Sequence, residues 1–381
     1  MIQRIITADN NYAGIGAWIK DNNIEKILLV GGGSVKRQVA FKAYLDQLVN
    51  RGVGVVYFSD FQPNPLYDSV EKGVKLFKDE HCNAIMAVGG GSALDVAKCI
   101  KLFSNMAGNG ANGDYLKQEI VPNQIPLLAM PTTAGTGSEA TRYAVIYYNG
   151  SKQSITHESS IPDTVLMDSS VLKSLPLYQK KATMMDAFCH ALESYWSVNS
   201  TEKSKEYSKK AIEMVLAHME GYLANSDEGN AGMLLAANVA GKAINITQTT
   251  AGHAMCYKIT SLFGVAHGHA AILCDRKLFP AMIRNTKNCI DPRGEDFLKK
   301  TLLDISQAMG CASAKEAAAK LEEIFARLEL EIPQATKEQF EILKTSVNPV
   351  RLKNHPVKLT EDTIDMLYHQ ILKRSEKENE S

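Results

Sequence analysis

Short apolar runs that alternate with helical patterns dominate the first half of the chain. Four such runs predict buried strands: Lys26–Val30, Val53–Phe58, Ala84–Val88 and Pro126–Met130. Between the second and third runs, apolar residues recur at the spacing of one helix face. Strands that alternate with helices indicate βαβ units, so we expect a Rossmann-like α/β domain with a parallel sheet.

The second half of the chain has a different pattern. The stretches Tyr178–Trp196, Glu206–Ala224 and Ala317–Leu330 have the apolar spacing of long helices, and strand signals disappear. We therefore predict an α/β domain at residues 1–177 and an all-α domain at residues 178–381.

Composition and charge exclude several classes of protein. Lys and Arg together number 42, as do Asp and Glu, so the basic excess typical of nucleic-acid binding is missing. No apolar run approaches the ~18 residues of a transmembrane helix, and the N-terminal stretch lacks the apolar core of a signal peptide. The seven scattered cysteines contain no C-x-x-C and fit reduced thiols. We expect a cytoplasmic protein with no nucleic-acid or membrane partner.

A glycine-rich turn follows the third predicted strand. Gly89, Gly90, Gly91 and Ser92 lie between that strand and a helical pattern. Glycines let the backbone approach a ligand closely, and the helix N-terminus offers unpaired N–H groups, so the turn predicts a phosphate or pyrophosphate site. An ordinary tight turn capped by Ser92 is the alternative, because the G-x-G-x-x-G fingerprint is absent.

A second glycine triplet follows the first predicted strand. Gly31, Gly32 and Gly33 are followed by Ser34 and Lys36. An acidic residue here would hold a ribose 2′-hydroxyl and repel a 2′-phosphate, but the loop contains none. The loop therefore favours NADPH over NADH as the cofactor, and NADH remains the alternative.

A third loop, Ala129–Thr141, is rich in hydroxyl groups and follows the fourth predicted strand. Its hydroxyl residues are Thr132, Thr133, Thr136, Ser138 and Thr141. Because the loop is expected near the two glycine turns, we interpret it as a cofactor contact. A turn with a capping glutamate is the alternative.

Histidines and one aspartate form a candidate metal site. Asp186 and His190 are four residues apart on one helix face among apolar neighbours, and buried Asp and His side chains need polar partners or a metal. The stretch GHAMCYKITSLFGVAHGHA adds His253 near the start of a helical pattern and His267 after a break at Gly264. One carboxylate and three imidazoles suit Fe²⁺, the expected metal, or Zn²⁺. A surface Asp–His pair is the alternative.

The motifs GGGSALDVAK, PTTAGTGSE, DAFCHALES and GHAMCYKITSLFGVAHGHA together resemble the iron-containing (group III) alcohol dehydrogenases, which have a dehydroquinate synthase-like fold. The matching stretches run from about Val30 to Pro280 in the order of that family. The resemblance implies metal- and NAD(P)H-dependent reduction of an aldehyde to a primary alcohol, and leaves His269 either as a residue that supports a ligand or as a structural residue. The metal ligands that it implies are Asp186, His190, His253 and His267.

The resemblance also implies cofactor-binding roles. The Gly89–Ser92 turn would hold the pyrophosphate, with Asp95 of the same motif included among the cofactor-binding residues. The Thr132–Ser138 loop would face the nicotinamide, and Lys152 would lie near the nicotinamide ribose. The stretch GGGSVK resembles the adenosine-side loop of NADP-using members. We also expect a homodimer or a larger homo-oligomer.

The sequence departs from the family pattern after the third ligand. Many members have a proton-relaying histidine where this chain has Tyr257, followed by Lys258 where a proline is usual. A tyrosine can still pass a proton, although its ordinary pKa is ~10; a packing role is the alternative. The wider pattern is most similar to the phosphonoacetaldehyde reductases, whose dianionic substrate would require a cation. Lys258 and Arg142 are the candidates for this cation.

Three other functions remain open from the sequence. One is a general alcohol, butanol or lactaldehyde-type dehydrogenase of the same family. Another is a dehydroquinate synthase-like lyase, which is disfavoured because those enzymes hold zinc with a glutamate and two histidines. The third is a catalytically silent metal-binding protein, since the relay histidine is replaced.

Overall fold

The computed structural model describes residues 3–33, 35 and 38–375. Within it the chain divides into two compact units, one of residues up to Ser174 and one of residues from Leu175 onward. The predicted boundary after residue 177 falls at the first residue of helix α6 (Leu177–Trp196). Ser34 and Lys36, which carried the expectation of NADPH, lie outside the described residues.

A six-stranded parallel sheet forms the centre of the first unit, in the order β1-β8-β5-β4-β2-β3. Its strands are β1 (Arg4–Thr7), β2 (Lys26–Gly31), β3 (Gly54–Phe58), β4 (Ala84–Gly89), β5 (Leu127–Pro131) and β8 (Thr164–Met167). The four strands predicted from the sequence are β2, β3, β4 and β5, so the predicted parallel sheet is confirmed. Strands β2, β4 and β5 are apolar and buried along almost their whole length, as expected for a sheet covered on both faces.

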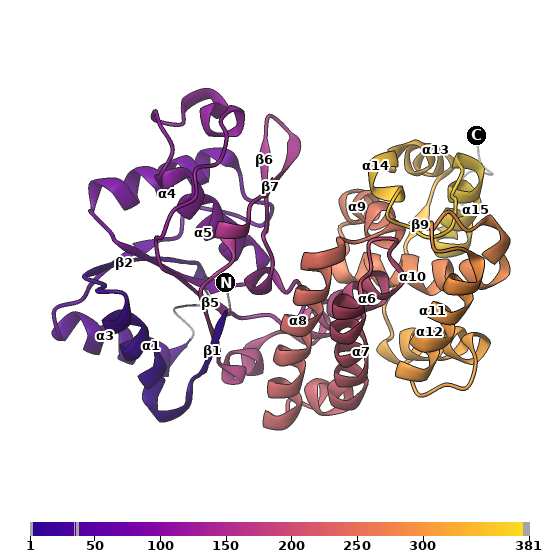
Figure 1. Cartoon of the computed structure of the whole chain (residues 1–381), viewed down its shortest axis with the longest axis horizontal. Helices are drawn as coiled ribbons and strands as arrows, with labels where there is room; N and C mark the ends of the chain where they lie inside the picture. The colour runs from indigo at the N-terminus through magenta and orange to yellow at the C-terminus, as the bar shows by residue number, and fades with distance from the viewer. Residues whose placement is uncertain (1–2, 34, 36–37, 376–381) are drawn as a thin grey trace. The chain divides into compact units, whose positions relative to one another are not determined.

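Helices cover both faces of this sheet, with α1 and α3 on one face and α4 and α5 on the other (Figure 1). The helices are α1 (Asp9–Asp21), α3 (Val39–Asn50), α4 (Tyr67–Asp79) and α5 (Gly91–Ser104), with short 3₁₀ turns η1 (Ala111–Lys117), η2 (Ser138–Ala140), η3 (Glu158–Ser160) and η4 (Ser169–Ser174). An antiparallel hairpin of β6 (Tyr143–Tyr148) and β7 (Ser151–Thr156) was not predicted. The ends of β2, β4 and β5 place the three predicted cofactor loops at one edge of the sheet.

The second unit is helical, as predicted, apart from one pair of two-residue strands, β9 (Gln334–Ala335) and β10 (Lys373–Arg374). After α6, its longer helices are α7 (Glu202–Leu223), α8 (Asp227–Thr247), α9 (Ala251–Phe263), α10 (His267–Arg284), α11 (Glu295–Ala308) and α12 (Ala314–Leu328). Its remaining elements are η5 (Thr286–Asn288), α13 (Lys337–Ser346), α14 (Pro349–Leu352) and α15 (Glu361–Ile371). Among the described residues, no helix combines the length and apolar character needed to cross a bilayer.

Candidate metal centre and nucleotide-binding loops

Helix α6 presents two predicted metal ligands and one further acid on the same face. Asp186, His190 and Glu193 follow one another at intervals of four and three residues, which places them on one side of a helix. All three are buried, and the residues between them are also buried and mostly apolar. Polar groups buried in this way need partners of opposite character, which helices α9 and α10 supply.

Helices α9 and α10 bring two more imidazoles to this face. His253 lies in the first turn of α9, which ends at Gly264 in the left-handed conformation (φ 68°), and His267 is the first residue of α10. Gly268 allows α10 to approach α6 closely: a Cβ at this position would overlap the carbonyl oxygen of Ala182 and lie 2.6 Å from Asp186 Cβ. The break and the close approach together place His267 beside Asp186.

Three of the four predicted ligands converge on a carboxylate oxygen of the fourth. The Nε2 atoms of His253, His190 and His267 lie 3.3, 3.9 and 4.0 Å from Oδ1 of Asp186. The rings of His190 and His253 stack with centroids 4.5 Å apart. The side chain of His267 is 36% exposed, whereas those of the other three are at most 7% exposed, so the cluster is accessible on the His267 side.

Donor atoms from three of these residues, Asp186, His253 and His267, all lie within 4.8 Å of one another, which is close enough to hold a single metal ion. One carboxylate oxygen with imidazole nitrogens is a donor set suited to Fe²⁺ or Zn²⁺. The residues present therefore fit the metal that the sequence predicts.

The electrostatics of the cluster favour a positive charge. Burial would raise the pKa of Asp186, but the neighbouring histidines hold it well below its usual range. Burial would lower the pKa of His253, yet Glu193 and Asp186 raise it to about 10. Two buried carboxylates thus create a negative potential at the point where the imidazole nitrogens meet, which is the condition for binding a cation.

Glu193 orients His253, a role that the sequence analysis missed. Its Oε1 is hydrogen-bonded to Nδ1 of His253 and accepts the backbone N–H of the same residue at 3.0 Å. Its Oε2 accepts hydrogen bonds from the N–H and the hydroxyl of Thr250. Because Nδ1 is engaged by the carboxylate, Nε2 is left facing Asp186, as in carboxylate–histidine–metal arrangements. The only sequence signal was the spacing from Asp186 and His190.

Replacing Glu193 with glutamine should weaken metal binding without removing a ligand. The amide keeps the shape but loses the charge that fixes the His253 ring, so we expect the metal dissociation constant to rise roughly 10- to 100-fold. Competition with a chromogenic chelator measures this constant. Glu220→Gln, at an exposed residue that pairs with Arg327, is the matched control. Equal metal dissociation constants for wild type and Glu193→Gln would show that Glu193 does not orient His253 for metal binding.

Tyr257 and Lys258 lie on α9, one turn beyond His253. The Tyr257 ring stacks on the His267 ring with centroids 5.3 Å apart, and its hydroxyl accepts a hydrogen bond from Nη1 of Arg351 at 3.0 Å. Burial raises the pKa of Tyr257 well above its usual range, and Arg351 opposes this effect. Lys258 is half-buried.

Two other residues singled out in the sequence have partners of their own. His269 is buried, with Nδ1 3.1 Å from the Tyr178 hydroxyl and Nε2 2.9 Å from the carbonyl oxygen of Glu331. Arg142, in the first unit, forms an ion pair with Glu158.

In the first unit the glycine turn and the hydroxyl loop lie against each other. Gly89 ends β4, and the N–H of Thr132 donates to its carbonyl oxygen at 3.0 Å. A Cβ on Gly90 would lie 3.4 Å from the Thr133 side chain, and one on Gly91 would lie 3.1 Å from that of Thr136. Gly90 also precedes the first turn of α5, whose N–H groups are directed toward this edge of the sheet. Ser92 is half-buried in that turn.

A buried lysine fastens the hydroxyl loop to α5. Lys98 donates to the Ser138 hydroxyl at 3.0 Å and to the carbonyl oxygens of Thr141 and Tyr143 at 2.7 and 2.8 Å. Asp95 accepts the Ser138 hydroxyl at 2.7 Å and the N–H of Val145 at 3.0 Å. Both Asp95 oxygens and the Ser138 hydroxyl are therefore engaged inside the protein.

Lys152, on β7, is half-buried and lies opposite Tyr147 in the hairpin. Burial raises the pKa of Asp95, and Lys152 is among the groups that oppose this rise. The two predicted cofactor residues are thus electrostatic neighbours.

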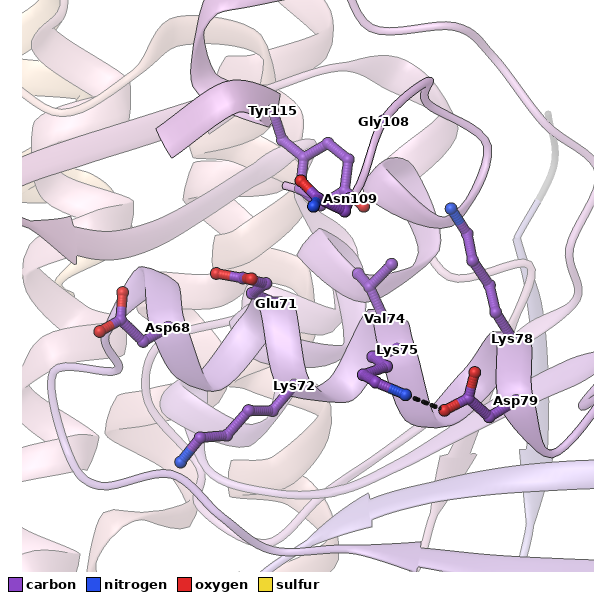
Figure 2. Close-up of a pocket in the computed structure, with 10 residues that line it drawn as sticks. All are labelled: Asp68, Glu71, Lys72, Val74, Lys75, Lys78, Asp79, Gly108, Asn109 and Tyr115. Carbon is purple, nitrogen blue, oxygen red and sulfur yellow. Dashed lines mark hydrogen bonds and ion pairs between the residues drawn. The ribbon is translucent and has the colours of Figure 1, made fainter. Parts of the chain in front are cut away.

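A hollow of about 600 Å³ lies elsewhere on the first unit, between α4 and the loop that includes Gly108 and Asn109 (Figure 2). Both acidic and basic side chains of α4 line it, and Lys75 pairs with Asp79. None of the predicted site residues lines it, so we assign it no part in the function.

Comparison with known proteins identifies the family. The family model "Iron-containing alcohol dehydrogenase" matches residues 3–169. The family model "Fe-containing alcohol dehydrogenase family, C-terminal" matches residues 180–372. Alcohol dehydrogenase 4 of Schizosaccharomyces pombe is 30% identical over 299 residues, covering 77% of this chain and 68% of the relative.

Two further proteins are similar over long stretches. The phosphonoacetaldehyde reductase of Streptomyces viridochromogenes is 27% identical over 263 residues, covering 66% of each chain. The structure of sulfoacetaldehyde reductase from Bifidobacterium kashiwanohense in complex with NAD⁺ is 24% identical with a TM-score of 0.86, covering 97% of this chain and 96% of that one, and shows the same fold. The protein belongs to the iron-containing alcohol dehydrogenase family and is an NAD(P)-dependent, metal-dependent alcohol dehydrogenase.

Proposed function

We propose that this enzyme reduces phosphonoacetaldehyde to 2-hydroxyethylphosphonate with NADPH. The observation that carries the redox assignment is the convergence of three imidazole Nε2 atoms on one oxygen of Asp186. The substrate assignment is supported by the 27% identity to a phosphonoacetaldehyde reductase. Of the two cations that the sequence suggests for an anionic substrate, Arg142 already has Glu158 as a partner, whereas Lys258 lies half-buried one residue after Tyr257.

In the proposed reaction, residues of the second unit hold the metal and supply the proton. When bound, the metal supplies Lewis-acid polarisation of the substrate carbonyl. Asp186, His190, His253 and His267 hold it, and Tyr257 is the group that passes the proton to the product oxygen. Its hydroxyl oxygen accepts the N–H of Arg351, which stabilises the anion left by proton loss.

The residues proposed to bind the nucleotide cofactor all lie in the first unit. The Gly89–Ser92 turn binds the pyrophosphate, Thr132, Thr133 and Thr136 face the nicotinamide, and Lys152 contacts its ribose. Gly32 and Gly33 line the adenosine side, and Ser34, also expected to bind there, lies outside the described residues. Because the polar atoms of Asp95 and Ser138 are engaged with Lys98, Val145 and each other, we assign these two residues to holding the loop rather than to touching the nucleotide.

A substrate panel tests the proposal. The metal-loaded enzyme is assayed by NADPH oxidation with phosphonoacetaldehyde, butyraldehyde and glyceraldehyde. We expect kcat/KM for phosphonoacetaldehyde to be at least about tenfold higher, which corresponds to ~1.4 kcal/mol. A preference for butyraldehyde or glyceraldehyde would instead support a general alcohol dehydrogenase and would reject the phosphonate assignment.

Replacing Gly32 with aspartate should shift the enzyme from NADPH toward NADH. No atom of the described residues lies within 4 Å of a Cβ placed at Gly32, so a side chain has room to begin there. Its carboxylate would repel a 2′-phosphate and accept a 2′-hydroxyl. The ratio of kcat/KM for the two cofactors measures the shift. A wild-type enzyme that already uses NADH about tenfold better would contradict the NADPH assignment.

A further inference from the structure

Arg351 places a positive charge beside the candidate metal centre. This half-buried residue lies on α14, and its Nη1 donates to the Tyr257 hydroxyl oxygen at 3.0 Å. Its guanidinium carbon also lies 5.0 Å from the centroid of the Tyr257 ring. Since that ring stacks on His267, a single side chain separates the guanidinium from a predicted metal ligand.

The charge of Arg351 is not neutralised by the described part of the chain. The other half-buried or buried arginines of the described chain have carboxylate partners: Arg276 pairs with Glu322, and Arg142 pairs with Glu158. Arg351 forms no ion pair with any described residue, and the Tyr257 hydroxyl accepts its only side-chain hydrogen bond there. Partial burial of an unpaired guanidinium is unfavourable, and an anionic ligand would offset that cost.

The segment that carries Arg351 is fastened to the start of α9. Asn348 caps α14 by accepting the N–H of Val350 at 2.9 Å, and Pro349 follows at the first helical position. Beyond α14, the side-chain amide of Asn354 donates to the carbonyl oxygen of Thr249 at 3.2 Å. The Asn354 contact joins the segment just after α14 to the residues just before α9, and the hydrogen bond to Tyr257 joins the guanidinium to α9 itself.

We propose that Arg351 binds the anionic head group of the substrate, with Tyr257 as the positioning residue that orients the guanidinium; this inference rests on the proposed function. A guanidinium has five N–H donors in a planar fork and can form two parallel hydrogen bonds to a phosphonate. One donor is engaged by Tyr257, and the rest remain for the ligand. Lys258, the cation expected from the sequence, makes no comparable side-chain contact with any residue that the structure describes.

The role proposed for Arg351 explains why position 257 is a tyrosine. Its ring lies close to both His267 and Arg351, and its hydroxyl oxygen is an acceptor that a protonated imidazole could not offer. The departure from the usual histidine and the unpaired arginine are thus two parts of one arrangement that suits an anionic aldehyde.

Arg351→Met and Arg351→Lys, assayed as metal-loaded enzyme with NADPH, test the proposal. We expect Arg351→Met to raise KM for phosphonoacetaldehyde roughly 10- to 100-fold, the range for lost charge-assisted hydrogen bonds. KM for butyraldehyde should stay within about twofold, because a neutral aldehyde makes no such bond. Any effect on proton transfer through Tyr257 would lower kcat for both aldehydes alike. Arg351→Lys keeps a positive charge, so its KM for phosphonoacetaldehyde should lie between those of the wild type and Arg351→Met. This variant remains informative if the methionine variant fails to fold.

Two comparison variants sharpen the result. Arg327→Met removes an exposed arginine of the second unit that pairs with Glu220, and should change neither KM. Lys258→Met tests the competing cation. If Lys258→Met raises KM for phosphonoacetaldehyde while both Arg351 variants leave it unchanged, the assignment of Arg351 is wrong.

An inhibition arm separates failure of this inference from failure of the proposed function. Methylphosphonate is tested as a competitive inhibitor of butyraldehyde reduction. Inhibition of wild type that is lost in Arg351→Met supports the anion site even if phosphonoacetaldehyde proves a poor substrate. A wild-type preference for phosphonoacetaldehyde that persists in both Arg351 variants, with unchanged inhibition, leaves the proposed function standing and overturns the role of Arg351.

Discussion

Replacing Asp186 with asparagine is expected to abolish metal binding and to lower kcat/KM by roughly 1,000-fold or more, because metal polarisation of a carbonyl contributes several kcal/mol. Oδ1 of Asp186 is the common neighbour of three imidazole Nε2 atoms. The amide preserves the size of the side chain but removes the charge that attracts a divalent cation. Glu193 remains, but it is engaged by His253 and Thr250 and cannot substitute as a ligand.

Metal content by mass spectrometry and steady-state kinetics on the same preparation measure this effect. Asp296→Asn is the matched control, since it makes the same change at a fully exposed side chain. Near-ultraviolet circular dichroism shows whether the variant stays folded. Full metal occupancy with wild-type kinetics in Asp186→Asn would exclude Asp186 as a ligand.

Replacing Gly268 with alanine should damage the metal centre without altering any ligand. The added Cβ would overlap the carbonyl oxygen of Ala182 and lie 2.6 Å from Asp186 Cβ, so α10 must move away from α6. Overpacking of this kind costs about 1–3 kcal/mol and should lower Tm by several degrees. His267 would move with the helix, and a displacement of ~1 Å can cost roughly 100-fold in rate.

Gly16→Ala is the control for this change, because a Cβ on Gly16 has only the Tyr44 hydroxyl within 4 Å, at 3.7 Å. We expect it to leave both Tm and metal affinity close to wild type. Calorimetry and chelator competition report the two quantities separately. If Gly268→Ala binds metal as tightly as Gly16→Ala does, the close approach of α10 to α6 does not determine the site.

The sequence predicted those strands whose burial produces a long apolar run. β2, β4 and β5 are buried on both faces, so their residues are continuously apolar. β1 escaped prediction because it is short and mostly exposed, and β8 because four residues are too few for a periodic signal. The β6–β7 hairpin is partly exposed and has a mixed polar pattern, which offered no clear period.

The same distinction applies to the candidate site. Asp186, His190, His253 and His267 stand out in the sequence because they share a short motif spacing among apolar residues. Arg351 does not, since it lies 94 residues from Tyr257 and only folding brings the two together. Lys98 resembles a surface lysine of an amphipathic helix until the structure shows its ammonium buried among the oxygens of the hydroxyl loop.

The division of the chain at Ser174–Leu175 separates the residues proposed to bind the nucleotide from those proposed to bind the metal and the aldehyde, so separate stretches of the gene would encode them. The proposed nucleotide-binding residues all precede residue 153, and the proposed ligands and the anion-binding arginine all follow residue 185. A mutation that changes the choice of nucleotide therefore leaves the coordination chemistry encoded elsewhere intact, and the reverse also holds. Recombination at this point would exchange one specificity at a time, so a lineage can acquire a new aldehyde while inheriting its reductant unchanged.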